Sequence, residues 1–142
     1  MHTPESWNAF LNMMEDSIRH REQTGTSKMI HRFDIFEMPK ELQVNLTSNG
    51  SLMQFTAETA VSFFMFRPEE MMARISPRPV LILHSARDRV CNYDEAFSLA
   101  RHAEPPFELH LLDGADHFMF VDANPQVAFT LRNWLDRYFP VG

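Results

Sequence analysis

The chain has 142 residues, of which 44% are hydrophobic and 12% aromatic, and its formal net charge is −6 at pH 7. This length and composition predict one globular domain with a sizeable core, and they exclude an intrinsically disordered chain. The acidic balance, with no basic cluster, argues against nucleic acid or an anionic membrane as a partner. No signal-peptide pattern or membrane-spanning apolar run is present, so we expect a cytoplasmic protein.

The first stretch predicts an amphipathic helix. Thr3 is a suitable cap, Pro4 suits the first helical position, and Gly25 is a typical stop. Between them, apolar side chains recur at helical spacing, which indicates one buried stripe. The stripe consists of Trp7, Phe10, Leu11, Met14 and Ile18.

The next forty residues carry weaker signals. We expect an extended or irregular connection over 26–39, a short helix over 40–46, a turn over 47–51, and a second helix after Thr56 that runs to Phe66. That second helix is apolar nearly all round, so it should be buried or cover something. His31 and Asp34 stand three residues apart, but no third ligand follows in a metal-site spacing, so we expect no metal.

The stretch from Pro79 to His117 organises the chain. An apolar run over 80–83 predicts a buried strand, and alternating residues over 107–111 predict a second strand with one drier face. Between them, Asn92 with Glu95 forms a capping box for a helix that Pro105 and Pro106 end. A strand–helix–strand unit makes its strands parallel. The turns after both strands therefore lie at one sheet edge.

Asp88 and His117 occupy those two turns, so we expect them to meet. A carboxylate beside an imidazole fixes the histidine tautomer and lets its other nitrogen act as a general base. The alternatives are that Asp88 only braces its turn and that His117 is a structural loop residue. Nearby polar residues are expected to pack or support the site, to stabilise turns, or to be solvated or form ion pairs; they are His84, Arg87, Arg89, Asp113 and Asp116.

Together with a final helix from Asn124-Pro125 to Pro140, these elements resemble the C-terminal half of an α/β-hydrolase, particularly the dienelactone-hydrolase-like and peptidase-like branch. The matching pieces are residues 75–88, the helix at 95–103, residues 111–118 and the terminal helix with Trp134. The resemblance implies that Asp88 is the triad acid and His117 the triad base, with no cofactor. It implies a single incomplete domain over 1–142, with a helical cap-like segment over about 1–66 and a βαβα part over about 67–142.

The sequence departs from that family at the nucleophile. Its four glycines form no Gly-x-Ser-x-Gly elbow, and Ser85 near the acid lacks that setting. We therefore expect the isolated chain to be inactive as a serine hydrolase. The first strand of the pair should have an open edge, which predicts self-association or docking of a complementary N-terminal hydrolase half.

Two questions of function stay open. The chain could belong to a serine hydrolase acting on esters, thioesters or amides, or it could be a non-catalytic binding or interaction module, or one half of a split hydrolase. The thirteen phenylalanines and ten methionines could fill a core or line a pocket for a small acyl or aromatic substrate. The single cysteine, Cys91, excludes an internal disulfide, and we interpret it as a small packed residue rather than a reactive thiol.

Overall fold

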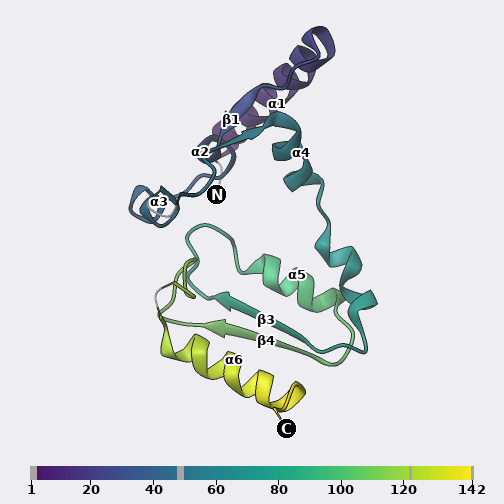
Figure 1. Ribbon diagram of the computed structural model, residues 1–142, viewed down its shortest axis with the longest axis vertical. Coiled ribbons are helices and arrows are strands. Elements are labelled where there is room, and N and C mark those ends of the chain that lie inside the picture. Colours follow the sequence, from purple (N-terminus) through teal and green to yellow (C-terminus); the bar gives the residue numbers. More distant parts are fainter. Residues whose placement is uncertain (1–2, 48–49, 122, 142) are drawn as a thin grey trace. The chain divides into compact units, whose positions relative to one another are not determined.

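The computed structural model describes residues 3–47, 50–121 and 123–141. The chain forms two compact units, Met1–Phe66 and Arg67–Gly142 (Figure 1). Two residues of the turn predicted at 47–51 lie outside the described residues. Among the residues that are described, no helix is both long enough and apolar enough to cross a membrane.

The first unit begins with α1 (Pro4–Thr24), as predicted. The Thr3 hydroxyl accepts a hydrogen bond from the Ser6 N–H at 3.2 Å, and Gly25 ends the helix at φ +74°. The buried face centres on Phe10, Met14 and Ser17. The predicted stripe was too wide, because Leu11 and Ile18 lie at its flank and are 41% and 43% exposed.

The segment after α1 contains more regular structure than predicted. β1 (Met29–His31), α2 (Arg32–Ile35), α3 (Lys40–Thr47), β2 (Gln54–Thr56) and α4 (Ala57–Met65) follow in order. β1 and β2 pair antiparallel, with Ile30 opposite Phe55. The extended or irregular connection expected over 26–39 is extended at β1, but the short helix α2 within it was not predicted. Strands of three residues are too short to give a periodic signal. The helix after Thr56 is confirmed, and the Thr56 hydroxyl accepts from the Thr59 N–H at 3.3 Å.

An aromatic cluster forms much of the first unit's core. Phe64 of α4 contacts Phe10 and Trp7 of α1, with ring centroids 4.8 and 5.4 Å apart. Ala57 and Ala60 are fully buried beside them. Further along α4 and at its end, Phe63, Met65 and Phe66 are 43%, 70% and 68% exposed, although the Phe63 ring contacts Phe36 and Phe55. Only one face of this apolar helix is thus buried within its unit.

The second unit has the predicted βαβα order. Its elements are η1 (Pro68–Ile75), β3 (Val80–Ser85), α5 (Asp94–His102), β4 (Phe107–Leu112) and α6 (Pro125–Tyr138). β3 and β4 are parallel, in register from Val80 opposite Phe107 to Ser85 opposite Leu112. Figure 1 shows α5 and α6 on opposite sides of this pair. Within the described part of the chain, β3 pairs with β4 alone.

The helices α5 and α6 of this unit begin with different N-terminal arrangements. The Asn124 side chain accepts from the Gln126 N–H at 2.8 Å and starts α6, as predicted. The capping box predicted for α5 is wrong: Asn92 Oδ1 accepts from the Asp94 N–H at 3.0 Å, and the helix begins two residues after Asn92. The Glu95 N–H bonds the Asn92 carbonyl at 3.1 Å. This turn is found instead of the predicted capping box.

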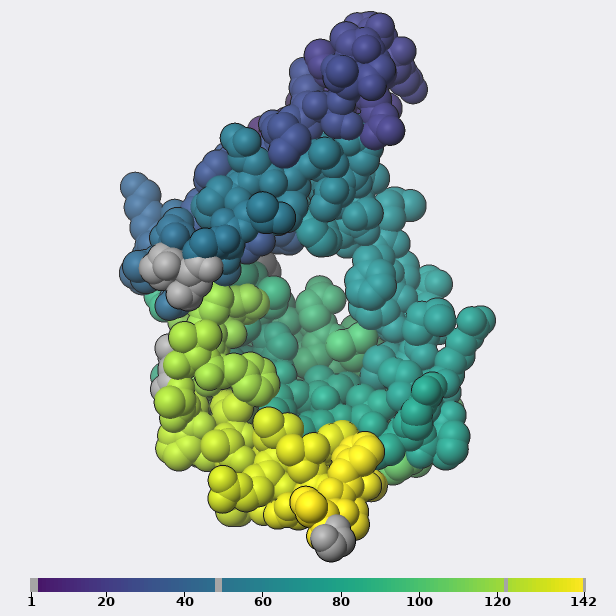
Figure 2. Space-filling view, in the orientation of Figure 1, coloured from purple at the N-terminus to yellow at the C-terminus, as the bar shows by residue number. Residues whose placement is uncertain are grey.

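Two small cores cover the two faces of the β3–β4 pair. Ile82 packs with Met72 and Ala96 under η1 and α5, while Leu112 packs with Met119 and Val127 on the α6 side. The predicted drier face of β4 is only partly covered, because Phe107 and Leu111 are 36% and 37% exposed. In the space-filling view α6, in yellow, lies at the surface of its unit (Figure 2). The two strands thus offer each helix only a narrow packing surface.

Candidate functional site

The site lies where β3 and β4 end. The two strands finish level with each other at Ser85 and Leu112, and the Ala86 N–H continues the pairing by donating to the Leu112 carbonyl at 3.0 Å. The loops after the two strands therefore start side by side. Open α/β sheets place ligand and catalytic groups at this carboxyl edge.

Asp88 and His117 meet between these loops. His117 Nδ1 lies 3.0 Å from Asp88 Oδ2. Asp88 Oδ1 accepts from the backbone N–H groups of Val90 and Cys91, both at 2.8 Å. The Asp88 side chain is 5% exposed and that of His117 is 31% exposed. A buried acid thus holds a partly open base.

The surroundings of Asp88 keep it ionised. Burial alone would raise the pKa of its carboxyl, but the N–H groups of Cys91 and Val90 and the His117 ring outweigh that effect, and the pKa is lowered overall. An ionised carboxylate accepts only, so the proton of this hydrogen bond belongs to His117 Nδ1. The arrangement leaves Nε2 to exchange a proton with another group.

His117 binds its proton tightly. Its pKa is raised to about 9, first through a hydrogen bond with the Cys91 side chain and then through Asp88, while burial opposes the rise. The Phe118 ring stands edge-on to the imidazole, with centroids 5.1 Å apart. The imidazole is therefore protonated at neutral pH in this structure.

Ser85, the last residue of β3, links the two loops. Its side chain is buried with 1% exposure, donates to the Ala115 carbonyl at 2.7 Å and accepts from the Arg87 N–H at 3.0 Å. A hydroxyl engaged in this way and shielded from solvent is a structural link. Ser85 is not placed to attack a substrate.

Two ion pairs also cross between the loops. Arg87 Nε lies 2.8 Å from Asp113 Oδ1, and Arg89 Nε lies 2.6 Å from Asp116 Oδ2. Asp116 Oδ1 also accepts from the N–H groups of Arg89 and His117, at 3.2 and 2.8 Å. Burial would raise the pKa of Asp116, but these donors lower it. The ion-pairing expected for both arginines is found, and Asp116 fixes the backbone of the base.

His84 lies beside the acid. Its Nδ1–H donates to the Ser85 carbonyl at 2.8 Å, and its Nε2 lies 3.8 Å from Asp88 Oδ2. Its side chain is 16% exposed. The carboxylate therefore has a second imidazole beside it, which agrees with the packing or supporting role expected for His84.

The interpretation of Cys91 as a packed residue is wrong, because Cys91 is exposed. Asp88 turns the chain so that its carboxylate binds the N–H groups two and three residues ahead, which lifts Cys91 out of the core. The Cys91 side chain is also the largest contributor to the raised pKa of His117. The Asp-x-x-Cys spacing was the available signal for this placement.

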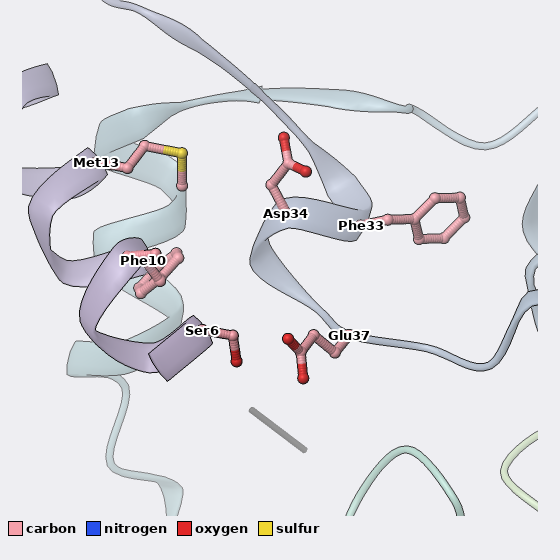
Figure 3. Close-up of a pocket in the computed structure, with 7 residues that line it drawn as sticks. Ser6, Phe10, Met13, Phe33, Asp34 and Glu37 are labelled. Atoms are coloured by element: carbon pink, nitrogen blue, oxygen red, sulfur yellow. The ribbon is translucent and has the colours of Figure 1, made fainter. Parts of the chain in front are cut away.

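A separate pocket of about 310 Å³ lies in the first unit, between α1 and α2 (Figure 3). Phe10 and Met13 line one side, and the carboxyl groups of Asp34 and Glu37 lie opposite, while the Phe33 ring points away from α1. His31 caps α2 through its Nδ1, which accepts from the Phe33 N–H at 3.3 Å. Across the described ranges, no group of three or more potential ligands is arranged to hold a metal ion.

Solved structures share this fold. The chain is similar to the α/β hydrolase GrgF from Penicillium sp. sh18, with a TM-score of 0.69 and 16% identity over 98% of this chain and 52% of that one. It is also similar to a hypothetical protein from Pseudomonas aeruginosa, with a TM-score of 0.67 and 19% identity over 96% of this chain and 46% of that one.

Neither the protein-family models nor the curated proteins match this sequence. The chain spans about half the length of the two solved structures that it resembles. At these identities the likeness concerns the fold alone. The predicted fold class is confirmed: this chain has an α/β-hydrolase-like fold.

Proposed function

We propose that this chain supplies the acid and base of a serine hydrolase of the dienelactone-hydrolase-like or peptidase-like kind. The observation that carries the proposal is the contact of 3.0 Å between His117 Nδ1 and a buried Asp88 carboxylate at the ends of two parallel strands. The hydrolase-like fold supports it. The reaction would be acyl transfer from a small acyl or aromatic ester, thioester or amide, without a cofactor.

Each residue has a defined task in that reaction. Asp88 holds the Nδ1–H of His117 and stabilises the imidazolium. Nε2 of the neutral ring takes the proton of a serine hydroxyl as the oxygen attacks the carbonyl carbon, and later returns it to the leaving group. Ser85 and the ion pair of Arg89 with Asp116 hold the two loops at the required separation.

The serine itself would come from residues outside this sequence. No Gly-x-Ser-x-Gly elbow occurs within the 142 residues, and Ser85 is buried. Because β3 pairs only with β4 in the described part of the chain, its second edge suits a further strand from a complementary hydrolase half. Without that half, loss of the nucleophile costs about a millionfold in turnover, so the isolated chain should be inactive.

The pKa of His117 sets the pH dependence. With a value of about 9, only roughly one ring in a hundred is neutral at pH 7. Because the base must start neutral, acyl transfer should rise with pH through the neutral range and level off near pH 9. Cys91→Ser should move this rise to lower pH, since it removes the side chain that contributes most to the raised pKa.

A fluorophosphonate probe tests the proposal because it reacts with an activated serine whatever the substrate. The tagged chain is added to native extract, recovered with its partners and treated with the probe. We expect no label on the chain and a label on a partner or on a longer product that contains this sequence. His117→Gln should abolish that label, whereas His102→Gln on the exposed end of α5 should leave it unchanged. Label on a serine of the chain itself would contradict the proposal.

A second candidate is a non-catalytic binding module. The apolar side chains that α4 leaves exposed and the acidic-rimmed pocket of about 310 Å³ favour it, because both suit a ligand without needing a nucleophile. This candidate predicts no probe label in any fraction and ligand binding that is indifferent to Asp88→Asn. Sedimentation of the purified chain would measure self-association through the β3 edge, independently of whether the chain is part of a hydrolase or a binding module.

A further inference from the structure

The outer edge of β4 has no neighbouring strand. In the described part of the chain β4 pairs only with β3, so the backbone groups on its other side bond to no strand. The strand Phe107–Leu112 contains neither proline nor lysine, the residues that commonly protect an exposed edge. Phe107 and Leu111 are partly exposed along it. This edge is therefore open to pairing with another strand.

The pairing with β3 decides which backbone groups of β4 face outward. The Val80 N–H donates to the Pro106 carbonyl at 3.0 Å. Farther along, the Ala86 N–H donates to the Leu112 carbonyl at the same distance. Because alternate residues of a strand direct their N–H and C=O groups to the same side, the even-numbered residues of β4 bond to β3. The residues whose backbone groups point away from β3 are Phe107, Leu109 and Leu111.

We propose that this β4 edge binds the β4 edge of a second copy of this chain, antiparallel and with Leu109 opposite Leu109. In that register Phe107 of each copy lies opposite Leu111 of the other. Every outward-facing residue then meets an outward-facing residue, and each such pair exchanges both of its backbone hydrogen bonds. The contact is two-fold symmetric and uses the same surface of both copies. It does not depend on the proposed function, which uses the opposite edge of the pair, at β3.

The side chains of β4 favour this register over its neighbours. Glu108 Oε2 lies 3.0 Å from His110 Nε2, and the two residues share the face of the strand that Arg137 of α6 contacts. With Leu109 on the two-fold axis, Glu108 of each copy lies opposite His110 of the other, so acid meets base.

Other registers lose this complementarity. A shift of one residue sets outward-facing backbone groups against inward-facing ones and breaks the hydrogen-bond ladder. A shift by one pair in one direction sets Glu108 opposite Glu108, and like charges directly opposite each other are destabilising. A shift by one pair in the other direction sets Glu108 opposite the apolar Leu112. The charge pattern of β4 is thus self-complementary in one register.

Apolar surface beside the edge adds to the contact. A stable interface buries about 1,200–2,000 Å² in total, which is more than two paired strands supply by their backbones. Phe107 and Leu111 are 36% and 37% exposed on the side of the pair that α5 covers. A groove of about 650 Å³ lies between the end of β4 and the start of α6, where Phe129 is 68% exposed. These side chains give a second copy apolar area next to the strand.

Sedimentation equilibrium of the full chain is the first test, and we expect a dimer at tens of micromolar. Leu111→Lys puts a charge on the pairing edge and should raise the dissociation constant by about tenfold or more. The matched control is Leu11→Lys on α1, because Leu11 is similarly exposed at 41% but lies in the other unit; it should leave the dimer unchanged. A monomeric wild-type chain, or equal weakening by both substitutions, would overturn the proposal.

Disulfide trapping tests the register and does not depend on the lysine variants. In a Cys91→Ser background, Glu108→Cys and His110→Cys chains with different tags are mixed and oxidised. Opposite residues of a non-hydrogen-bonded antiparallel pair have Cα atoms about 4.5 Å apart, within disulfide range. Two cysteines at the same position would lie on a diagonal of about 7–8 Å. The mixture should therefore cross-link several-fold faster than either variant alone.

The wrong interface gives a different result in the same experiment. If the copies associate through the β3 edge, the mixture forms no more cross-linked dimer than the single variants. Equal rates in all samples, or no cross-linked dimer in the mixture, would therefore overturn the proposal even if the wild-type chain sediments as a dimer.

Discussion

The two units of this chain use their side chains in opposite ways. The first unit builds an aromatic core from Trp7, Phe10 and Phe64 and leaves Phe63, Met65 and Phe66 largely exposed. The second has small cores around Ile82 and Leu112 but concentrates polar contacts in two loops. The comparison places the candidate site in the second unit and the most exposed apolar helix in the first.

The two units are also stabilised by different kinds of interaction. Loss of a ring in the first unit leaves a cavity, with a cost that scales with its volume. Loss of a polar group between the loops of the second unit leaves partners buried and unsatisfied. The two tryptophans allow each unit to be followed separately, because Trp7 lies in α1 and Trp134 in α6. Changing either one to Phe gives a chain with a single fluorescent reporter.

The largest expected effect is on the proposed reaction. In the proposed assembled hydrolase, His117→Gln removes the group proposed to take the serine proton, and Asp88→Asn no longer fixes the tautomer of that histidine, so turnover should fall by about 10⁴-fold. Single-turnover hydrolysis of an activated ester measures the loss. If Asp88→Asn left turnover within a few fold, the assignment of chemistry to these loops would be wrong.

Next comes the core of the first unit. Phe10→Ala removes a ring with 4% exposure that stacks on Trp7 and contacts Phe64, and should cost about 3–5 kcal/mol in the free energy of unfolding. Urea unfolding followed by Trp7 in a Trp134→Phe background measures it. The neighbouring Leu11→Ala, 41% exposed, serves as the control and should cost under about 1 kcal/mol.

The link between the two loops should show a smaller effect. Ser85→Ala leaves the Ala115 carbonyl and the Arg87 N–H without the buried hydroxyl, so we expect a loss of about 1–3 kcal/mol. Trp134 fluorescence in a Trp7→Phe background reports it. Ser98→Ala on α5 is the control, with an expected change of about 0.5 kcal/mol or less. Equal losses in the two variants would mean that Ser85 does not join the loops.

The sequence predicts the second unit better than the first. In the second unit the apolar run of β3, the prolines after α5 and the Asn124 cap are local signals, and they give the βαβα order and the shared edge of Asp88 and His117. In the first unit, β1 and β2 are three residues each and depend on pairing across more than twenty residues. Such pairing leaves no local periodicity to read.

The details of the site depended on contacts that spacing alone does not encode. Arg89 pairs with Asp116 across 27 positions, and His84 approaches Asp88 because β3 ends there. Cys91 was misjudged because cysteine is usually buried, whereas the Asp88 turn lifts this one outward. Turn chemistry overrode the average preference of the residue.

The smallest expected effect concerns pH, and it distinguishes the two units most cleanly. The folded pKa of His117 is raised to about 9 from an ordinary value of about 6.5. Its contribution to stability should therefore be complete below pH 6.5 and be lost as pH rises towards 9 and beyond. The shift would correspond to about 3 kcal/mol at full value, but the side chain is 31% exposed, so we expect about 1 kcal/mol.

Urea unfolding at pH 6 and pH 9.5, followed by Trp134, measures this loss. His117→Gln should flatten the dependence, and Cys91→Ser should shrink it, because both remove the contact that raises the pKa most. Unfolding followed by Trp7 should not show it, since His117 lies in the other unit. If the free energy of unfolding fell equally at both tryptophans, and fell as much in His117→Gln, the pH dependence would come from groups outside the loops. The two units would then not differ in their electrostatics.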